Sequence, residues 1–233
     1  MDQPASSQAF WAIYDATGIR PEWLIPGLAI ESGLNPSLPN AAGFPYYGIN
    51  QISGTWISQN LGVTPQAYLT WSASQQLLKA VLPYMRGQVA AFGKLQSGIR
   101  VYQANFYPAS LSYARTLDST IVAKPSAAYN ANAGLDANGS GAITPGDLGV
   151  VLQKQLSKSY VVDAISQAYA QRPWEQQTDP IYGLDFQKNL LADPLVATIA
   201  AAGIVLASGF AAHWLVQFAE NKPLTLPAWA RVL

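Results

Sequence analysis

The sequence predicts an all-α protein, and three observations lead to that class. Residues 1–123 contain no long alternating run of β-branched residues, which is the pattern of a half-buried strand. Helix-start signals recur instead, because Pro21 stands where a helix can begin and Thr64-Pro65 pairs a capping residue with a proline. Half of the 233 residues are hydrophobic, which is ample for a buried core. We therefore expect one compact helical domain over residues 1–123.

The expected helices of this domain follow one another along the chain. Ser6 or Ser7 can cap the first helix. Its apolar side is expected to include Phe10, Trp11 and Tyr14. Pro26 either starts the next helix or kinks it. Residues 66–85 are then expected to form one helix, and residues 97–115 two helices separated by a proline.

Residues 124–193 are expected to hold a linker, a loop motif and further helices. Residues 124–135 are small, polar and rich in turn formers, which is typical of a linker. Residues 148–170 have helical character, whereas residues 171–183 are irregular. The sequence contains no internal repeat.

The composition excludes several classes of function. Only 11% of the residues are charged, against roughly 25% in an average soluble protein. The net charge is zero and no basic stretch is present, so we expect no tight binding of nucleic acid. The chain has no cysteine, which excludes disulfides and thiolate metal sites. The amino-terminal residues lack the pattern of a secretory signal peptide.

Glu31 is the candidate catalytic residue. It is the only residue of the stretch 23–34 that bears a charge at neutral pH. A carboxyl group among apolar side chains favours its neutral form, so its pKa should rise. A carboxylic acid with a raised pKa can donate a proton near neutral pH, as cleavage of a glycosidic bond requires. The alternative is a solvated glutamate near a helix end, just before Gly33.

Four short motifs carry a resemblance to a known family. Residues 31–36, ESGLNP, match an E-S-G-x-N-P motif, and residues 48–52, GINQI, are similar to a G-L-M-Q-I motif. Residues 54–56 are the GTW that follows it, and residues 102–105, YQAN, stand where a Y-N-A-G motif is expected. In this order and rough spacing, residues 8–120 resemble the soluble lytic transglycosylase family, which is related to goose-type lysozyme.

The resemblance implies a lysozyme-like helical catalytic domain in which Glu31 is the catalytic acid/base and Tyr102 helps to orient it. The chain also departs from the family pattern. Asn50 stands where the family has methionine, the third motif is shifted, and the segment before Gly48 is slightly longer than usual. The stretch NFYPASL, residues 105–111, is similar to transglycosylase domains in phage virion proteins.

The acids near Glu31 bear on the type of reaction. A hydrolase with two carboxylates needs the second within about 5 to 10 Å of the first. Residues 32–117 contain neither Asp nor Glu, although Asp15 or Glu22 could still fold close to Glu31. The resemblance implies a reaction that needs one acid: Glu31 protonates the glycosidic oxygen, then removes the proton from the muramoyl 6-hydroxyl. The product is a 1,6-anhydro sugar, and hydrolysis by a muramidase is the alternative.

Aromatic and polar side chains around these motifs suit a sugar groove. Aromatic rings can stack on the apolar faces of pyranose rings. Polar side chains such as that of Gln51 could hold an N-acetyl group or a hydroxyl. The aromatic candidates near the motifs are Tyr46, Tyr47, Trp56, Tyr102, Phe106 and Tyr107. The alternative is that most of these rings belong to the core. The predicted substrate-binding residues are Ser32, Tyr47, Asn50, Gln51, Ser53, Tyr102 and Tyr107.

Residues 136–147, DANGSGAITPGD, match the template of an EF-hand calcium loop. Gly141 fills the sixth position, where the chain turns sharply, and Ile143 fills the apolar eighth position. The predicted oxygen ligands of a structural Ca²⁺ are Asp136, Asn138, Ser140, Ala142 (through its carbonyl), Thr144 and Asp147. The alternative is a simple turn followed by a helix cap at residues 144–147. No cofactor is expected for catalysis.

Residues 194–219 contain no Asp, Glu, Lys or Arg. A bilayer is crossed by about 20 apolar residues, so this stretch is long enough for a transmembrane helix. Small residues recur every fourth position at Gly203, Ala207 and Ala211, which suits close helix packing. The alternative is a helix buried in an assembly. Residues 220–233 would form a short tail.

Together these patterns predict an enzyme that cleaves peptidoglycan glycan strands. By analogy with similar proteins, we expect a phage virion protein, in the tail or ejected from it, that opens the host cell wall for genome entry. It would act in the host periplasm or envelope, in contact with other virion proteins and with the membrane. Two alternatives are an inactive virion or tail protein that only binds glycan, and a membrane-anchored bacterial wall-remodelling enzyme.

Overall fold

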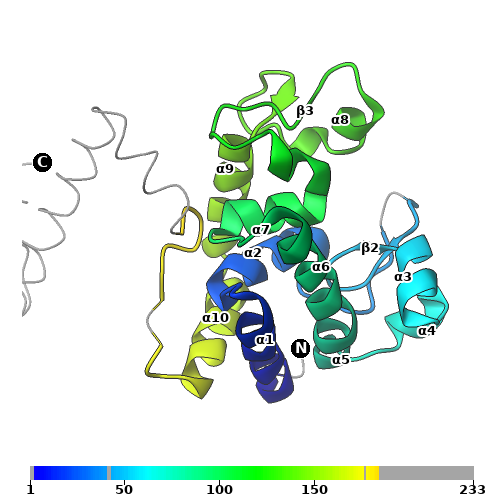
Figure 1. Cartoon of the computed structure of the whole chain (residues 1–233), viewed down its shortest axis with the longest axis vertical. Helices are drawn as coiled ribbons and strands as arrows, with labels where there is room; N and C mark the ends of the chain where they lie inside the picture. Colours follow the sequence, from blue (N-terminus) through cyan, green and yellow to red (C-terminus); the bar gives the residue numbers. More distant parts are fainter. Residues whose placement is uncertain (1–2, 41–42, 176, 184–233) are drawn as a thin grey trace, which may run out of the picture. The chain divides into compact units, whose positions relative to one another are not determined.

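Helices dominate the part of the chain that the structure describes, which comprises residues 3–40, 43–175 and 177–183 of the computed structural model (Figure 1). This content is compatible with the predicted all-α class. The helices are α1 (Gln3–Thr17), α2 (Pro21–Ser32), α3 (Gly54–Leu61), α4 (Pro65–Leu69), α5 (Ala73–Gln76), α6 (Leu82–Phe92), α7 (Gly98–Phe106), α8 (Ala127–Ala131), α9 (Pro145–Leu156) and α10 (Ser159–Gln171).

Short strands and turns of helix connect these elements. Strands β1 (Tyr46–Tyr47) and β2 (Ile52–Ser53) pair antiparallel, with Tyr46 opposite Ser53. Strands β3 (Val122–Ala123) and β4 (Ala142–Ile143) form a second antiparallel pair. The remaining turns are the π-helix η1 (Leu77–Val81) between α5 and α6 and the 3₁₀ helices η2 (Pro108–Ser112) and η3 (Ala133–Leu135).

Several predicted helix boundaries are confirmed. Pro21 is the first residue of α2, and Pro26 lies inside that helix. Thr64 caps α4, because its side-chain oxygen accepts a hydrogen bond from the Ala67 amide at 3.2 Å. Pro108 begins η2 just after α7 ends at Phe106.

Other predicted boundaries are wrong. Helix α1 begins at Gln3, so Ser6 and Ser7 lie inside it and do not cap it. Residues 66–85 do not form one helix, because the capping box of Ser72 starts a new helix after α4. The helical character predicted for residues 148–170 is confirmed, and it is divided between α9, which ends at Leu156, and α10, which starts at Ser159.

Helix α2 lies at the centre of the packing, against α7, α9 and α10 (Figure 1). Most of its side chains are buried, including that of Glu22, so nearly every face of the helix packs against other parts of the protein. Helix α1 packs against α10 and α6. Two buried indoles join distant parts of the chain: the Nε1 of Trp11 donates to the carbonyl of Ala168 at 2.7 Å, and that of Trp23 to the carbonyl of Asp179 at 3.1 Å.

The described residues before and after position 123, up to residue 183, belong to one compact unit. The core shared by α1 and α2 includes Val161, Ile165 and Ala168 of α10. Residues 124–183 therefore contribute to the same folded body as the segment that carries Glu31.

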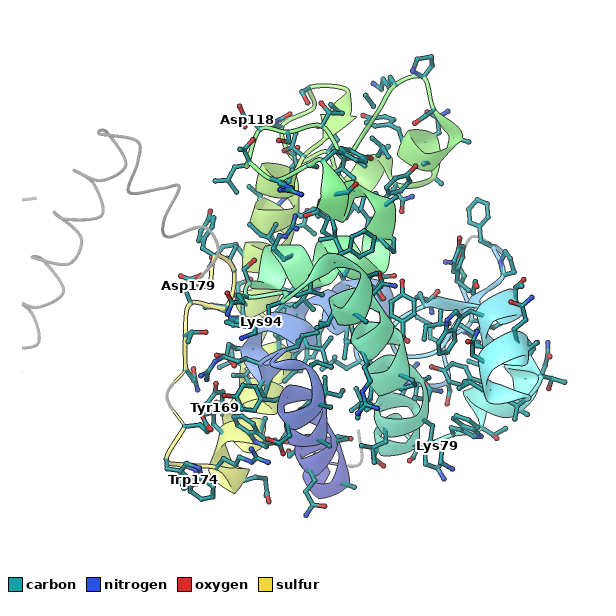
Figure 2. All side chains as sticks on the ribbon, viewed as in Figure 1. Lys79, Lys94, Asp118, Tyr169, Trp174 and Asp179 are labelled. Carbon is teal, nitrogen blue, oxygen red and sulfur yellow. The ribbon has the colours of Figure 1, made fainter. Side chains whose placement is uncertain are left out.

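A second, smaller apolar cluster supports the segment between α2 and α6. Its fully buried members are Ile52, Ile57, Tyr68 and Ala80. Charged side chains lie outside both clusters: Lys79, Lys94 and Asp118, labelled in Figure 2, are exposed. The low charge content is thus confined to the surface, apart from the few buried acids described below.

The structure describes no helix that is both long enough and apolar enough to span a bilayer. The predicted transmembrane stretch, residues 194–219, and the predicted tail, residues 220–233, lie outside the described residues.

Candidate active site

Glu31 lies in the last turn of α2, where it lines a cleft of about 370 Å³. The helix ends directly after it because Gly33 adopts a left-handed conformation (φ 62°), and its amide donates to the carbonyl of Ala29 at 3.0 Å. The described residues that line the cleft are Glu31, Asn40, Phe44, Tyr46, Gln51, Asn105, Phe106, Tyr107, Ala128, Ala131 and Asn132.

The surroundings of Glu31 change its acidity. The side chain keeps a small exposed area towards the cleft, while protein atoms enclose it elsewhere. Burial raises the pKa of Glu31 from its usual 4.5 to about 7, and hydrogen bonds from Tyr102 and Asn105 partly oppose that rise. The site therefore holds a carboxyl group that is protonated in a substantial fraction of molecules at neutral pH.

Helix α7 supplies both hydrogen-bond donors. Tyr102 and Asn105 are three residues apart, so they lie on the same face of the helix. Tyr102 is buried, and burial together with the nearby Glu31 raises the pKa of its phenol well above the usual value. The phenol thus stays protonated, and its hydroxyl donates a hydrogen bond to the Glu31 carboxylate. Tyr102 is thus a hydrogen-bond partner of Glu31.

Close approach of the two helices depends on a glycine. A Cβ atom at Gly27 of α2 would lie 3.2 Å from Cδ2 of Tyr102, tighter than an ordinary contact. The missing side chain lets the Tyr102 ring lie against α2 within reach of Glu31. Asn105 is fixed as well, because its Nδ2 donates to the carbonyl of Asn50 at 3.2 Å.

Gln51 lines the cleft, but its carboxamide forms hydrogen bonds with other groups of the protein. Its Nε2 donates to the carbonyls of Leu38 (3.1 Å) and Gly48 (3.0 Å), and its Oε1 accepts from Nδ2 of Asn40 at 3.1 Å. Its backbone has a positive φ of 48°, which is uncommon for a residue with a side chain. These bonds make Gln51 a brace that holds the segment from Leu38 to Gln51 against the cleft.

Tyr102 is not among the described lining residues of the cleft, and neither are four other predicted substrate-binding residues. Ser32 is buried and donates to the carbonyl of Ile49 at 2.7 Å, while Ser53 caps α3 by accepting from the Trp56 amide at 3.2 Å. Tyr47 packs on the smaller apolar cluster. Asn50 is fully buried, and within the described part of the chain neither polar atom of its side chain has a partner. Tyr107 does line the cleft.

Two of the aromatic candidates from the sequence, Tyr46 and Phe106, line the cleft, and the structure adds Phe44, which the sequence did not identify as a site residue. Phe44 and Tyr46 line the cleft although 49% and 43% of their surfaces are exposed, so their rings are available to a ligand. In the sequence, Asn105 was recognised only as part of the motif at residues 102–105, and no role was assigned to it. Three further lining residues, Ala128, Ala131 and Asn132, come from the region that was expected to be a linker. No signal in the sequence pointed to them.

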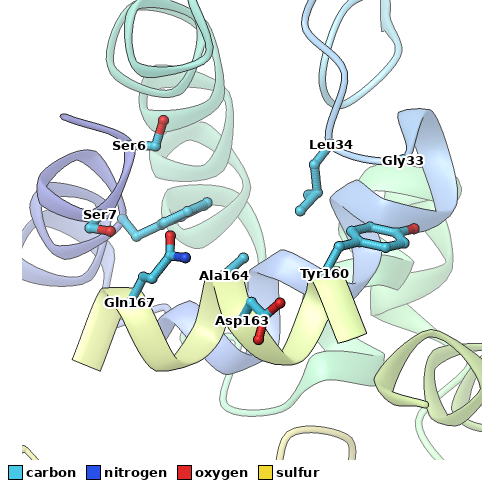
Figure 3. A pocket seen from close by; sticks show the side chains of 9 residues that line it. Ser6, Ser7, Gly33, Leu34, Tyr160, Asp163, Ala164 and Gln167 are labelled. Atoms are coloured by element: carbon cyan, nitrogen blue, oxygen red, sulfur yellow. The ribbon is translucent and has the colours of Figure 1, made fainter. Parts of the chain in front are cut away.

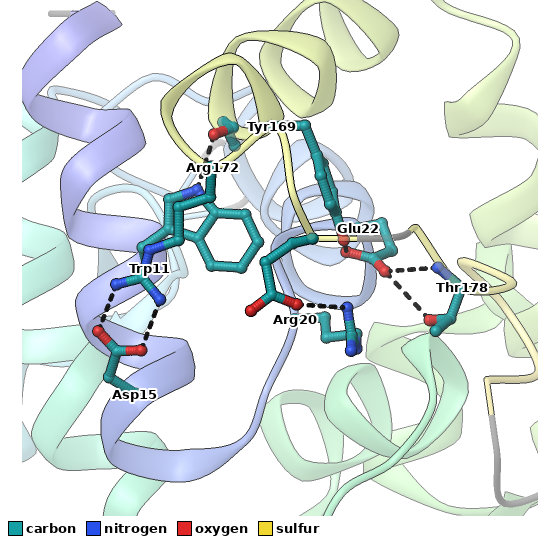
Figure 4. Close-up of polar contacts among 9 residues, drawn as sticks. Trp11, Asp15, Arg20, Glu22, Tyr169, Arg172 and Thr178 are labelled. Carbon is teal, nitrogen blue, oxygen red and sulfur yellow. Dashed lines mark hydrogen bonds and ion pairs between the residues drawn. The ribbon is translucent and has the colours of Figure 1, made fainter.

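The acids that were open alternatives as a second carboxylate have other partners (Figure 4). Glu22 is buried in α2, where its carboxylate accepts from the hydroxyl of Tyr169 at 2.7 Å and from the amide of Thr178 at 2.9 Å. Asp15 forms a two-bonded ion pair with Arg172. Neither lines the cleft, so Glu31 is the only acid among the described residues that do.

The first half of the loop of residues 136–147 is a turn held by hydrogen bonds to the side chain of Asp136. The Asp136 carboxylate accepts from the amides of Ser140 (3.1 Å) and Gly141 (2.8 Å), and Gly141 has the left-handed φ of 86° that the sharp turn needs. Oδ1 of Asn138 also accepts from the Ser140 amide, at 2.8 Å. The side chains of Asp136 and Asn138 thus both accept from the Ser140 amide and stabilise the turn.

The second half of the loop forms the predicted helix cap. Asp147 is buried, and its Oδ2 accepts from both the amide (3.0 Å) and the hydroxyl (2.6 Å) of Thr144. This is a capping box at the start of α9. In the described part of the chain, no three Asp, Glu or His side chains form a group that could hold a metal ion. The last predicted ligand of the loop, Asp147, is therefore engaged by Thr144.

A separate cavity of about 280 Å³ lies between the start of α1, the end of α2 and α10 (Figure 3). Phe10 and Leu34 line it, together with Asp163 and Gln167 of α10. None of the residues predicted to bind substrate or metal is among its described lining residues. Of the predicted catalytic and substrate-binding residues, Glu31, Gln51 and Tyr107 line the cleft at Glu31.

Comparisons of the chain with protein-family models, with curated proteins and with solved structures gave no match. The geometry at Glu31 and the sequence motifs are accordingly the basis of the proposal below.

Proposed function

We propose that the chain is a peptidoglycan lytic transglycosylase with a lysozyme-like catalytic domain, in which Glu31 is the single acid/base. One observation carries the proposal: Glu31 has a pKa of about 7, receives hydrogen bonds from Tyr102 and Asn105, and has no other acid beside it among the described lining residues of the cleft. A carboxyl group with this pKa can act first as an acid and then as a base near neutral pH.

The proposed reaction cleaves the bond between N-acetylmuramic acid and N-acetylglucosamine. Protonated Glu31 donates its proton to the glycosidic oxygen as the bond from that oxygen to C1 breaks. The resulting Glu31 carboxylate takes the proton of the muramoyl 6-hydroxyl. The oxygen of that hydroxyl attacks C1 at the same time, which closes the 1,6-anhydro ring. No water is consumed, so no second carboxylate is needed to activate one. Tyr102 and Asn105 would steady the carboxylate between the two proton transfers.

The exposed aromatic side chains of the cleft support a carbohydrate substrate. Phe44 and Tyr46 present ring surface beside Glu31, and sugar rings offer apolar faces of similar size. The resemblance to phage transglycosylase domains supports a virion protein that opens the host wall, with peptidoglycan, other virion proteins and the membrane as partners. This biological setting rests on that resemblance.

The direct test is mass spectrometry of the muropeptides released from purified peptidoglycan by the wild-type chain, Glu31→Gln and Asp15→Asn. We expect products ending in 1,6-anhydro-muramic acid from the wild type. Asp15→Asn should give the same products, because residue 15 lies outside the cleft. Glu31→Gln should lose about 10²- to 10⁴-fold in rate. Reducing-end products would instead indicate hydrolysis, and binding to sacculi without release would indicate a glycan-binding protein.

We also propose that the loop of residues 136–147 binds Ca²⁺ weakly. Asp136, Asn138, Ser140 and the carbonyl of Ala142 would hold the ion, with Thr144 and Asp147 as the remaining predicted ligands. The low charge of the loop and the engagement of Asp147 by Thr144 support an affinity in the millimolar class. The ion would have a structural role and no part in the bond cleavage.

A further inference from the structure

Helix α8 contributes a wall of the cleft at Glu31. Ala128, Ala131 and Asn132 line the same cleft as Glu31, although about 100 residues of chain separate them from it. The two alanines offer small apolar side chains, and Asn132 a carboxamide. This wall lies beyond the part of the chain that carries the family resemblance, so its role cannot be taken from that family.

The carboxamide of Asn132 is held in one orientation. Its Nδ2 donates to the carbonyl of Ala128 at 2.9 Å. In the described part of the chain its Oδ1 has no hydrogen-bond partner, so it remains an acceptor for a hydroxyl or amide hydrogen of a ligand. Asn132 is partly exposed, as a residue in contact with a ligand in the cleft should be.

A helix as short as α8 does not hold its own position. It has 5 residues, whereas isolated helices shorter than about 12 residues are marginal in water. Its place must therefore come from contacts with the rest of the protein. Ser126 caps it by accepting from the amide of Tyr129 at 3.1 Å.

Tyr129 is the main anchor of α8. Its ring is buried, with 4% of its surface exposed, and the ammonium of Lys124 lies 5.3 Å from the ring centre. Its hydroxyl donates to Oδ2 of Asp136 at 2.7 Å. The same Oδ2 accepts from the amide of Gly141, so one carboxylate holds both the helix and the loop of residues 136–141.

We propose that α8 is a substrate-contacting wall whose position is set by the hydrogen bond from Tyr129 to Asp136. Asn132 contacts the glycan, whereas Tyr129 and Asp136 are positioning residues that act through α8. The loop thereby controls the affinity of the Glu31 site from outside the cleft. This inference rests on the proposed function, because the ligand is taken to be a peptidoglycan glycan strand.

The test uses the full chain carrying Tyr129→Phe, with Tyr113→Phe as its matched control. Tyr113 is another phenol of this region and donates to a backbone carbonyl, that of Ile121, at 3.0 Å, but it does not line the cleft. Amide hydrogen exchange over residues 127–135 measures the position of α8 without any substrate. Binding of purified glycan strands is measured in variants that also carry Glu31→Gln, so that the strands are not cleaved. KM and kcat are measured in variants that retain Glu31. Every measurement contains a chelator, so that Ca²⁺ has no effect.

We expect Tyr129→Phe to speed exchange in residues 127–135 and to weaken glycan binding and raise KM about 3- to 10-fold, with kcat within about twofold of the wild type. Tyr113→Phe should leave all of these values within about twofold. Asn132→Ala should weaken binding like Tyr129→Phe without the faster exchange, and Asn130→Ala, an exposed neighbour that does not line the cleft, should change neither.

Three results would overturn the inference. Unchanged exchange in Tyr129→Phe would mean that the hydrogen bond does not position α8. Faster exchange with unchanged binding and KM would mean that α8 does not contact the glycan. Equal effects of Tyr129→Phe and Tyr113→Phe would reveal a general loss of stability. If the wild-type chain neither binds nor cleaves glycan while exchange responds as expected, the proposed function fails and the link from Asp136 to α8 stands without a glycan role.

Discussion

The phenol of Tyr102 donates a hydrogen bond to the carboxylate of Glu31 across the contact between α7 and α2. Because the bond favours the charged form of Glu31, it holds the pKa of that carboxyl below the value that burial alone would give. Two opposing influences thus set the acidity of the candidate catalytic group, and they can be changed separately.

Tyr102→Phe should raise the pKa of Glu31 further above 7, since the variant removes a donor and leaves the burial. The alkaline limb of the profile of kcat/KM against pH should move to higher pH, and kcat should fall because the carboxylate is less well oriented. Profiles of the wild type, Tyr102→Phe and Tyr113→Phe measure the shift. An unmoved limb in Tyr102→Phe would show that the bond has no influence on the acid.

The raised pKa of Glu31 also predicts how stability depends on pH. The folded chain keeps a proton on Glu31 up to a pKa of about 7, whereas the unfolded chain releases it near pH 4.5. Stability should therefore decline as the pH rises through this window. Glu31→Gln does not titrate, so it should be more stable than the wild type by about 1–2 kcal/mol near pH 8, a figure reduced for the partial exposure of the side chain.

Urea unfolding of both chains between about pH 4 and pH 8 measures that difference. It should vanish near the acid end, where Glu31 is protonated in both states. A difference that is the same at every pH would reflect packing of the new amide and would contradict the raised pKa.

Gly48→Ala should destabilise the loop that carries Gln51. Gly48 has a φ of 77°, and a Cβ there would lie 2.4 Å from Cε1 of Tyr68 and 2.5 Å from Oε1 of Gln76. Gly62 is the matched control, with a φ of 67° but no atom within 4 Å of the added carbon. We expect a loss of about 1 kcal/mol for Gly62→Ala, from strain alone, and at least about 2 kcal/mol for Gly48→Ala. Chemical unfolding that gave equal losses would refute the steric argument.

Addition of Ca²⁺ should raise the unfolding temperature of the wild-type chain, because an ion that binds only the folded state stabilises it. The rise should need millimolar Ca²⁺ and should be absent in Asp136→Asn. Mg²⁺ at the same concentration controls for ionic strength. An identical response to both ions, or an unchanged response in Asp136→Asn, would leave the loop as a turn and a helix cap.

The sequence predicted local structure well wherever a local signal decides it. Pro21 and Thr64 mark helix starts because their side chains act within one turn of the backbone. Prediction failed where a competing local signal was overlooked, as at Ser72, whose capping box interrupts the expected long helix. Ser6 and Ser7 have the chemistry of caps, but α1 extends past them and packing of its whole length on α10 and α6 decides its start.

The candidate site was predictable only in part for the same reason. Glu31 and Tyr102 stand in recognisable motifs, and Tyr107 follows one of them. Ser32 also stands in a motif and Ser53 lies between two of them, yet both hydroxyls form hydrogen bonds within the protein. The residues of α8 lie in a stretch of alanine and asparagine that predicts a linker. Helix α8 is held by the hydrogen bond from the hydroxyl of Tyr129 to the carboxylate of Asp136, and that pairing has no signature in the sequence.

The contacts of α1 and α2 with residues 168–179 have a consequence for synthesis. The indoles of Trp11 and Trp23 and the carboxylate of Glu22 all find their partners about 150 residues later in the chain. On the ribosome, the helix that bears Glu31 would have to wait for those residues before it could be fully packed. A nascent chain, or one cut short before α10, would leave Glu22 without the hydroxyl of Tyr169 and would lack the finished fold around its acid. The fold around the candidate active site would in this way be completed only after residues 168–179 have been synthesised.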